Sequence, residues 1–241
     1  MFRNRFDARQ SRLTASGQDG LIHISRAVCP ARKNSVKPSK RMSGRSRVPA
    51  RQRLGVTPWI IGCVATETRL RACARKAPAH CDWLEVRLDL VGLCGGQWPD
   101  LCAAAQTAGR PVLLTIRAAR EGGKWKGKET DRQALMLAGL SSVAAVDMEI
   151  DTEILESVAQ AAHACGVQVV GSFHDFKRTP SLETLQTVER RGRQMGADVV
   201  KIATQVRSVA DLARLMALPT LAQGPIAVLG MGTRGAISRV A

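Results

Sequence analysis

The 241-residue sequence predicts an α/β protein, a (β/α)8 barrel (TIM barrel) that lacks its eighth βα unit and carries a disordered basic N-terminal arm. Three observations lead to this fold class. Seven short runs of apolar and β-branched residues alternate with helical patterns, as parallel strands joined by helices do. The alternation keeps the same type throughout the body of the chain. Polar and charged residues gather near the carboxyl ends of the runs, where barrel enzymes build their active sites.

The strands are expected in the apolar runs, in chain order at residues 59–64, 82–89, 111–117, 144–150, 167–174, 196–204 and 225–231. Helical patterns follow six of them, in order up to about residue 79, at about 99–108, 131–140, up to 164, from 181 onward, and at about 208–217. Ser181 is a plausible N-cap for the fifth of these helices, because a serine hydroxyl can accept a hydrogen bond from an unpaired amide of the first turn. An open, doubly wound sheet is the alternative architecture. That fold favours a Gly-rich dinucleotide-binding turn after the first strand, and Cys63-Val64-Ala65-Thr66 is not one.

The net charge of +16 is concentrated at the N-terminus. Residues 1–57 contain 14 Lys and Arg against two acids, a net of +12, and the remainder carries only +4. We therefore expect a basic arm of low structure at residues 1–55 and a catalytic domain at residues 56–241. The arm could be a targeting segment, a nucleic-acid or membrane-binding arm, or non-native sequence upstream of the true start. We favour the last, because the arm lacks interleaved aromatics and the folded pattern begins abruptly after it.

The composition excludes several classes of protein. A hydrophobic content of 45% allows a sizeable core, and no apolar run approaches the roughly 18 residues that a membrane span needs. The seven cysteines show no paired C-x-x-C spacing, so neither a zinc site nor a disulfide framework is expected. Free thiols fit a cytoplasmic protein, with an organellar transit peptide as a minor alternative. We expect neither a membrane nor nucleic acid as a partner.

Lys201 is unusual because it lies within a run that otherwise resembles a buried strand, Gly196-Ala197-Asp198-Val199-Val200-Lys201-Ile202-Ala203-Thr204. Burial disfavours the ammonium form, so a lysine in this position tends toward a lowered pKa and a nucleophilic amine. Such an amine forms Schiff bases with ketones. The alternative is a lysine at the end of a strand that reaches solvent.

Other polar residues accompany this lysine at the ends of the expected strands: Glu85, Arg87, Asp89, Arg117, Asp147, Glu149, His174 and, with a thioether, Met231. Glu85 and Arg87 are two residues apart and therefore share one face of their strand. They could also form a purely structural ion pair. Two arginines among the acids argue against a metal site. Together with the lysine, a histidine that titrates near neutrality predicts imine-based proton abstraction on an acidic, hydroxylated ketone.

These residues stand in motifs that resemble those of type I 3-dehydroquinate dehydratase, from about Trp59 to the last residue. The motifs occur in the family's order: Glu85-Val86-Arg87-Leu88-Asp89, Thr115-Ile116-Arg117 with Glu121-Gly122-Gly123, Asp147-Met148-Glu149, Ser172-Phe173-His174-Asp175-Phe176 with Thr179-Pro180, the Lys201 run, and Met231-Gly232 with Ile237-Ser238-Arg239. Each motif is short, but six in the right order are strongly specific. The resemblance implies a lyase of the shikimate pathway, and so of aromatic amino acid biosynthesis, that removes water from 3-dehydroquinate by syn elimination.

The resemblance also implies roles for individual residues. Lys201 would form the Schiff base, His174 would act as general base and acid, and Glu121 would support His174. The substrate would be bound through Glu85, Arg87 and Arg117 at its hydroxyls and through Arg239 at its carboxylate, and Met231 would pack near the imine. No metal and no organic cofactor is expected, and members of the family are commonly homodimers.

Two features depart from the family pattern. Cys63 stands where some members have a substrate-contacting serine, and the family pattern continues beyond Ala241 with an eighth strand and a loop bearing Ser and Gln. From the second departure we expect a chain of low solubility and weak or no activity. The alternatives for function are another Schiff-base barrel lyase or aldolase, and an inactive fragment whose basic arm binds anionic partners.

Overall fold

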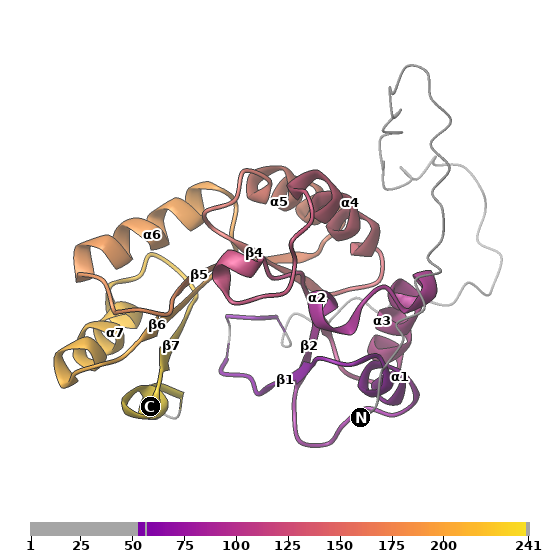
Figure 1. Cartoon of the computed structure of the whole chain (residues 1–241), viewed down its shortest axis with the longest axis horizontal. Coiled ribbons are helices and arrows are strands. Elements are labelled where there is room, and N and C mark those ends of the chain that lie inside the picture. The colour runs from indigo at the N-terminus through magenta and orange to yellow at the C-terminus, as the bar shows by residue number, and fades with distance from the viewer. Residues whose placement is uncertain (1–52, 56, 240–241) are drawn as a thin grey trace, which may run out of the picture. The chain divides into compact units, whose positions relative to one another are not determined.

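The computed structural model describes residues 53–55 and 57–239 of the chain (Figure 1). The predicted basic arm therefore lies outside the described residues, except for residues 53–55. The described part forms one sheet of seven strands that pair in chain order, each parallel to the next. The seven predicted strands are confirmed as β1 (Ile61–Val64), β2 (Trp83–Arg87), β3 (Val112–Thr115), β4 (Ala145–Glu149), β5 (Gln168–Asp175), β6 (Val199–Gln205) and β7 (Ile226–Met231).

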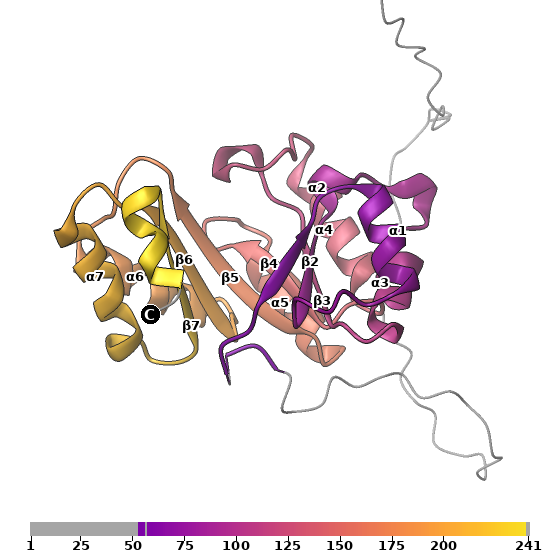
Figure 2. The same ribbon diagram turned by 90° about the horizontal axis from the view of Figure 1, so that it is seen from below.

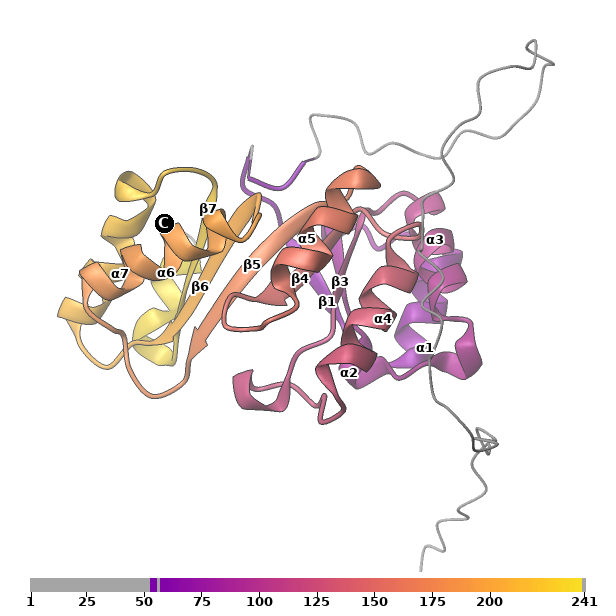
Figure 3. The same ribbon diagram turned by 90° about the horizontal axis from the view of Figure 1, so that it is seen from above.

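Helices connect the strands and cover one face of the sheet. They are α1 (Glu67–Arg75), α2 (Leu88–Val91), α3 (Trp98–Thr107), α4 (Glu129–Gly139), α5 (Leu155–Ala164), α6 (Leu182–Gln194) and α7 (Val209–Leu221), with 3-10 turns η2 (Cys94–Gly96), η3 (Ala119–Glu121) and η4 (Thr233–Arg239). In Figure 1, α4, α5, α6 and α7 follow one another along the outside of the curved sheet. Figures 2 and 3 show α1 and α3 side by side next to β2 and β3. The predicted α/β barrel architecture is confirmed, and within the described residues no ladder joins β7 to β1.

Local sequence explains where several helices begin. Ser181 caps α6 as predicted, because its hydroxyl accepts a hydrogen bond from the amide of Thr184 at 3.2 Å. Ser208 caps α7 in a reciprocal capping box, in which Asp211 accepts a hydrogen bond from the Ser208 amide at 3.0 Å. These bonds satisfy amides that have no partner inside the helix.

The second strand is shorter than the sequence predicts. The apolar run suggests a strand over 82–89, but β2 ends at Arg87, and Leu88–Val91 turn into the short helix α2. The reason is a long-range contact. The carboxylate of Asp89 accepts hydrogen bonds from the amides of Arg117 at 3.2 Å and Lys124 at 3.0 Å, so the chain leaves the sheet to place it there.

The inner face of the sheet changes from apolar to polar within two residues. Its apolar layer lies toward the amino ends of the strands and consists of Trp83, Leu113, Ala145, Val170 and Val199. Side chains two positions further along a strand lie on the same face. In the same strand order, these are Glu85, Thr115, Asp147, Ser172 and Lys201. The apolar layer therefore forms the floor under a polar layer.

Leu54 belongs to this floor, although it falls within the range predicted as the arm. Its side chain is buried against Trp83 and its neighbours in the apolar layer. Its amide donates to Oε1 of Gln168 at 2.9 Å, and Nε2 of Gln168 donates back to the Leu54 carbonyl at 3.3 Å. The reciprocal amide pair fixes this backbone at the amino end of β5.

We expect Leu54→Ala to lower the free energy of unfolding by about 2 kcal/mol, because it removes buried methyl groups from a packed layer. Leu93→Ala is the matched control, since Leu93 is half exposed and the same truncation there should cost less than about 0.5 kcal/mol. Urea unfolding of the two variants measures the difference. Equal losses would mean that Leu54 is not part of the core.

Candidate active site

Lys201 lies in the middle of β6 and points into the polar layer. Its Nζ donates to Oδ2 of Asp147 at 3.1 Å and lies 4.0 Å from Oε1 of Glu85. The side chain is 18% exposed, so it is neither sealed in the core nor free in solvent. The two carboxylates come from β4 and β2, and they supply the counter-charge that a largely buried ammonium needs.

Asp147 is the fully buried centre of the polar layer. Besides Lys201, it accepts hydrogen bonds from Nη2 of Arg117 at 2.7 Å and from the Ser172 hydroxyl at 2.6 Å. Burial alone would raise the pKa of Asp147, but the charges of Arg117 and Lys201 and the Ser172 hydrogen bond hold the pKa below its usual range. Asp147 is therefore an anion beside the lysine at pH 7.

The guanidinium of Arg117 is almost completely buried and is shared by three partners. Nη1 donates to the Ser172 hydroxyl at 2.6 Å and lies 3.3 Å from Oε1 of Glu149, while Nη2 pairs with Asp147. Burial would lower the pKa of Arg117, but the charges of Asp147 and Glu149 outweigh it and raise the pKa. The arginine thus compensates two buried carboxylates within the layer.

His174 and Glu121 form a second pair close to this cluster. His174 Nδ1 and Glu121 Oε2 are joined by a hydrogen bond of 2.8 Å, and the imidazole stacks on the ring of Phe176 at a centroid distance of 6.2 Å. Burial, followed by the charge of Arg117, lowers the pKa of His174 to about 4. Burial, followed by the charge of Glu149, raises the pKa of Glu121 to about 8. Both groups are therefore neutral at pH 7, which suits an imidazole that must accept a proton.

The rim of the layer contains Glu85 and Arg87, as the sequence predicts. Glu85 accepts a hydrogen bond from the Thr115 hydroxyl at 2.9 Å. Arg87 does not pair with Glu85 but forms a bidentate pair with Asp89, at 2.9 and 2.8 Å. The side-chain hydrogen bond to Asp89 is the main cause that raises the pKa of Arg87. The alternative of a structural Glu85–Arg87 ion pair is therefore not what forms, because Arg87 pairs with Asp89.

The remaining predicted site residues lie at the carboxyl end of the sheet or outside the described residues. Met231 ends β7, and its carbonyl accepts a hydrogen bond from Nε2 of Gln205 at 3.4 Å. Arg239 ends η4, but its side chain lies outside the described part of the chain. Cys63 is exposed on β1 opposite Glu85, and burial of part of the thiol, followed by the charge of Glu85, raises its pKa.

Two residues that build this site have no specific role in the sequence-based predictions. The sequence marks Asp147 only as an acid near a strand end, whereas the structure makes it the partner of both Lys201 and Arg117. Ser172 stands in a motif that predicts no function for it. The available signal was spacing, since both lie two residues after an inner apolar residue of the same strand.

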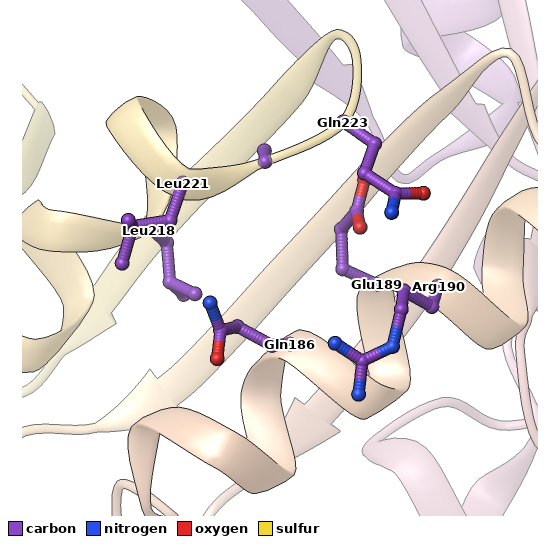
Figure 4. Close-up of a pocket in the computed structure, with 7 residues that line it drawn as sticks. Gln186, Glu189, Arg190, Leu218, Leu221 and Gln223 are labelled. Carbon is purple, nitrogen blue, oxygen red and sulfur yellow. The ribbon is translucent and has the colours of Figure 1, made fainter.

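Three other kinds of functional feature are possible in a protein of this class: a pocket on the helical layer, a metal centre and a membrane-spanning helix. A shallow pocket between α6 and α7 is lined by Gln186, Glu189, Arg190, Leu218, Leu221 and Gln223 (Figure 4), on the outer helical layer and away from Lys201. Among the residues with described positions, no group of three or more His, Cys, Asp or Glu could hold a metal ion. None of the described helices has the length and apolarity that a membrane crossing requires.

Comparisons with known proteins give a consistent result. The family of type I 3-dehydroquinase matches residues 63–241. A 3-dehydroquinate dehydratase of Methanosarcina barkeri is 36% identical over 193 residues, which cover 73% of this chain and 77% of that protein. The structure of 3-dehydroquinate dehydratase from Enterococcus faecalis is similar with a TM-score of 0.71 at 27% identity, covering 78% of this chain and 85% of that one. The corresponding structure from Geobacillus kaustophilus gives a TM-score of 0.69 at 29% identity, covering 77% and 78%.

We expect Asp147→Asn to lower the free energy of unfolding at pH 7 by about 3 kcal/mol, because it leaves Arg117 and Lys201 without their shared buried anion. The pKa of Asp147 is lower in the folded chain than in the unfolded chain. Its contribution to the free energy of unfolding is therefore present above the unfolded pKa and is lost as the pH falls through the folded pKa.

The matched control is Asp151→Asn. Asp151 also pairs with an arginine, Arg191 at 2.7 Å, but both side chains are about half exposed. This exposed pair should contribute less than about 1 kcal/mol. Chemical denaturation at pH 7 compares the two variants, and equal losses would show that the buried cluster does not stabilise the fold.

Proposed function

This chain belongs to the type I 3-dehydroquinase family, and from that premise we propose that it dehydrates 3-dehydroquinate through an imine on Lys201. One observation carries the proposal. An amine that lies 3.1 Å from a buried carboxylate shares the inner surface of the sheet with a neutral imidazole on the adjacent strand. Imine chemistry on a ketone requires a nucleophilic amine and a separate base of this kind.

The first step is formation of the imine. In its neutral form, Lys201 attacks the ketone carbon, the ketone oxygen takes up protons and leaves as water, and the nitrogen retains a positive charge. Asp147 lies beside this nitrogen, and its lowered pKa keeps it ionised, so it stabilises the iminium throughout. The cation makes the adjacent carbon acidic because the electrons of a broken C–H bond can move into it.

The second step is the elimination. With Nδ1–H donating a hydrogen bond to Glu121, Nε2 of His174 has a free lone pair and removes the proton from the carbon next to the iminium. The resulting enamine expels the hydroxyl group, which receives the proton from His174 and leaves as water. A second water molecule then hydrolyses the imine, which releases the product and regenerates the amine of Lys201.

Substrate binding is proposed from the family resemblance together with the rim of the site. Glu85, Arg87 and Arg117 are assigned to the ring hydroxyls, Arg239 to the carboxylate, and Met231 to packing near the imine. Glu85 and Arg87 lie side by side at the edge of the polar layer, where a hydroxylated ring above Lys201 could reach them. The terminal nitrogens of Arg117 donate to Asp147 and Ser172, and these contacts hold the guanidinium in the polar layer, where it would meet a ring hydroxyl.

The assembly, compartment and domain organisation are further parts of the proposal. The resemblance to the family supports a homodimer in the cytoplasm that needs neither metal nor organic cofactor. The composition supports a basic arm over residues 1–55 before the catalytic domain at 56–241, with Leu54 packed beneath that domain. Light scattering of the purified chain distinguishes a dimer from a monomer.

Borohydride reduction in the presence of 3-dehydroquinate tests the imine directly. We expect the reduced adduct on Lys201 in the wild type and no adduct in Lys201→Arg, because a guanidinium retains the charge but does not form the imine. Peptide mass mapping identifies the labelled residue. Lys177→Arg is the control, since Lys177 is exposed on the loop after β5 and should not affect labelling. A folded wild type without an adduct on Lys201 would refute the proposed function.

The raised pKa of Glu121 predicts a pH dependence. The carboxyl is neutral at pH 7 and ionises as the pH rises through about 8, and its carboxylate then makes His174 a stronger base. We expect the single-turnover rate of the wild type to rise between pH 7 and 9. Glu121→Gln should match the wild type within about threefold at pH 7 but fall behind by about tenfold at pH 9.

Glu183→Gln serves as the control for this profile, because Glu183 is exposed at the start of α6 and should leave it unchanged. If Glu121→Gln kept the full rise, the titrating group would have to be another residue.

A further inference from the structure

Arg132 is a fully buried arginine that the mechanism does not use. It lies on the first turns of α4, and its side chain has no solvent exposure. Its guanidinium donates to the Ile116 carbonyl at 3.1 Å, the Thr152 hydroxyl at 3.1 Å and Oε2 of Glu129 at 2.5 Å. It also forms a short ion pair with Oε2 of Glu149. Burying a cation is costly, so this set of partners indicates a requirement for charge at this position.

Glu149 connects this arginine to the active site. While Oε2 pairs with Arg132, Oε1 accepts a hydrogen bond from the amide of Ala118 at 2.9 Å and lies 3.3 Å from Nη1 of Arg117. The carboxylate of Glu149 is also buried, so it depends on these neighbours for compensation. Removing Arg132 would take away one of the two arginines that pair with the carboxylate of Glu149, and Arg117 would remain.

The amide that Glu149 holds begins the turn that carries Glu121. Ala118 precedes the 3-10 turn η3 (Ala119–Glu121), and Glu121 at its end is hydrogen-bonded to His174. The far end of the same loop is held by Asp89, which accepts a hydrogen bond from the Lys124 amide at 3.0 Å. Two buried carboxylates therefore fix the loop, and each is paired with its own arginine, Asp89 with Arg87 and Glu149 with Arg132.

We propose that Arg132 is a positioning residue for the Glu121–His174 pair, acting through Glu149 and the amide of Ala118 without touching the substrate. The inference rests on the proposed function for its effect on turnover, but its effect on His174 is independent of the reaction. When the loop is held, Glu121 and His174 stay in contact and shielded from water. When it is released, water reaches the imidazole.

The titration of His174 gives the test, because burial is the main cause of its lowered pKa. In Arg132→Gln we expect the midpoint to rise from about 4 toward the ordinary value by at least about one pH unit, since hydration of the imidazole favours the imidazolium. Histidine NMR on the substrate-free chain measures the midpoint, with the His174 signal assigned from a His174→Gln variant. We also expect kcat with 3-dehydroquinate to fall by about 10- to 100-fold because the imidazole is misplaced, with KM changed less than about threefold.

Arg120→Gln is a closely matched control. Arg120 lies in the same loop and also pairs with Glu129, at 3.5 Å, but its side chain is half exposed. It should leave the His174 midpoint and kcat unchanged. Arg132→Lys keeps the cation with fewer donors, so it should give a smaller shift and partial rescue of kcat.

The experiments distinguish failure of the proposed role of Arg132 from failure of the proposed function. An Arg132→Gln variant that is less stable, but keeps the wild-type His174 midpoint and kcat, would show a purely structural role and overturn the proposal. If that variant does not fold, Arg132→Lys decides: a raised midpoint supports the proposal and an unchanged one overturns it. If the wild type does not dehydrate 3-dehydroquinate, the proposed function fails, and the NMR titration still decides the role of Arg132.

Discussion

The buried carboxylate of Asp147 is the interaction on which the rest of the site depends. It lies at the centre of the polar layer and binds an arginine from the end of β3, a hydroxyl from β5 and the amine from β6. An unpaired anion in this position would be prohibitively costly to bury, and so would either cation without it. The charges are therefore mutually required, and they hold Lys201 in one place from which it can reach a ketone. The same anion that compensates the resting ammonium is positioned to stabilise an iminium.

A second constraint is the abrupt change of polarity along the inner face of the sheet. Trp83, Leu113 and Val199 form part of an apolar floor, with Leu54 packed beneath it, and the residues two positions later form the reactive layer. The floor separates the polar layer from solvent at the amino ends of the strands. Low hydration in turn explains why burial is the leading cause of the pKa shifts of both His174 and Glu121.

The loop that carries Glu121 lies beside the buried charges of the polar layer and is held by two of them. Carboxylates from β4 and α2 accept hydrogen bonds from backbone amides of this loop. Leu88 and Asp89 lie in α2 and not in the predicted strand, and this placement brings the carboxylate of Asp89 to the loop amides. Arg132 is the counterpart on the other side, and it reaches the same loop through Glu149. The position of the Glu121 loop beside the imidazole thus depends on Asp89 and Glu149, two carboxylates to which the proposed mechanism gives no contact with the substrate.

The sequence by itself determined the number and order of the strands, the α/β barrel class, the family, and the lysine, histidine and glutamate expected to carry the chemistry. These follow from local signals, namely alternating apolar runs and short motifs in a fixed order. Only the tertiary structure decided which charges meet. It pairs Lys201 with Asp147 and Arg87 with Asp89, makes Arg117 a shared counter-ion, and pairs Arg132 with Glu149, the carboxylate that holds the Glu121 loop. The physical reason is that these partners lie on different elements, so their pairing depends on strand order and burial, which no local pattern in the chain records.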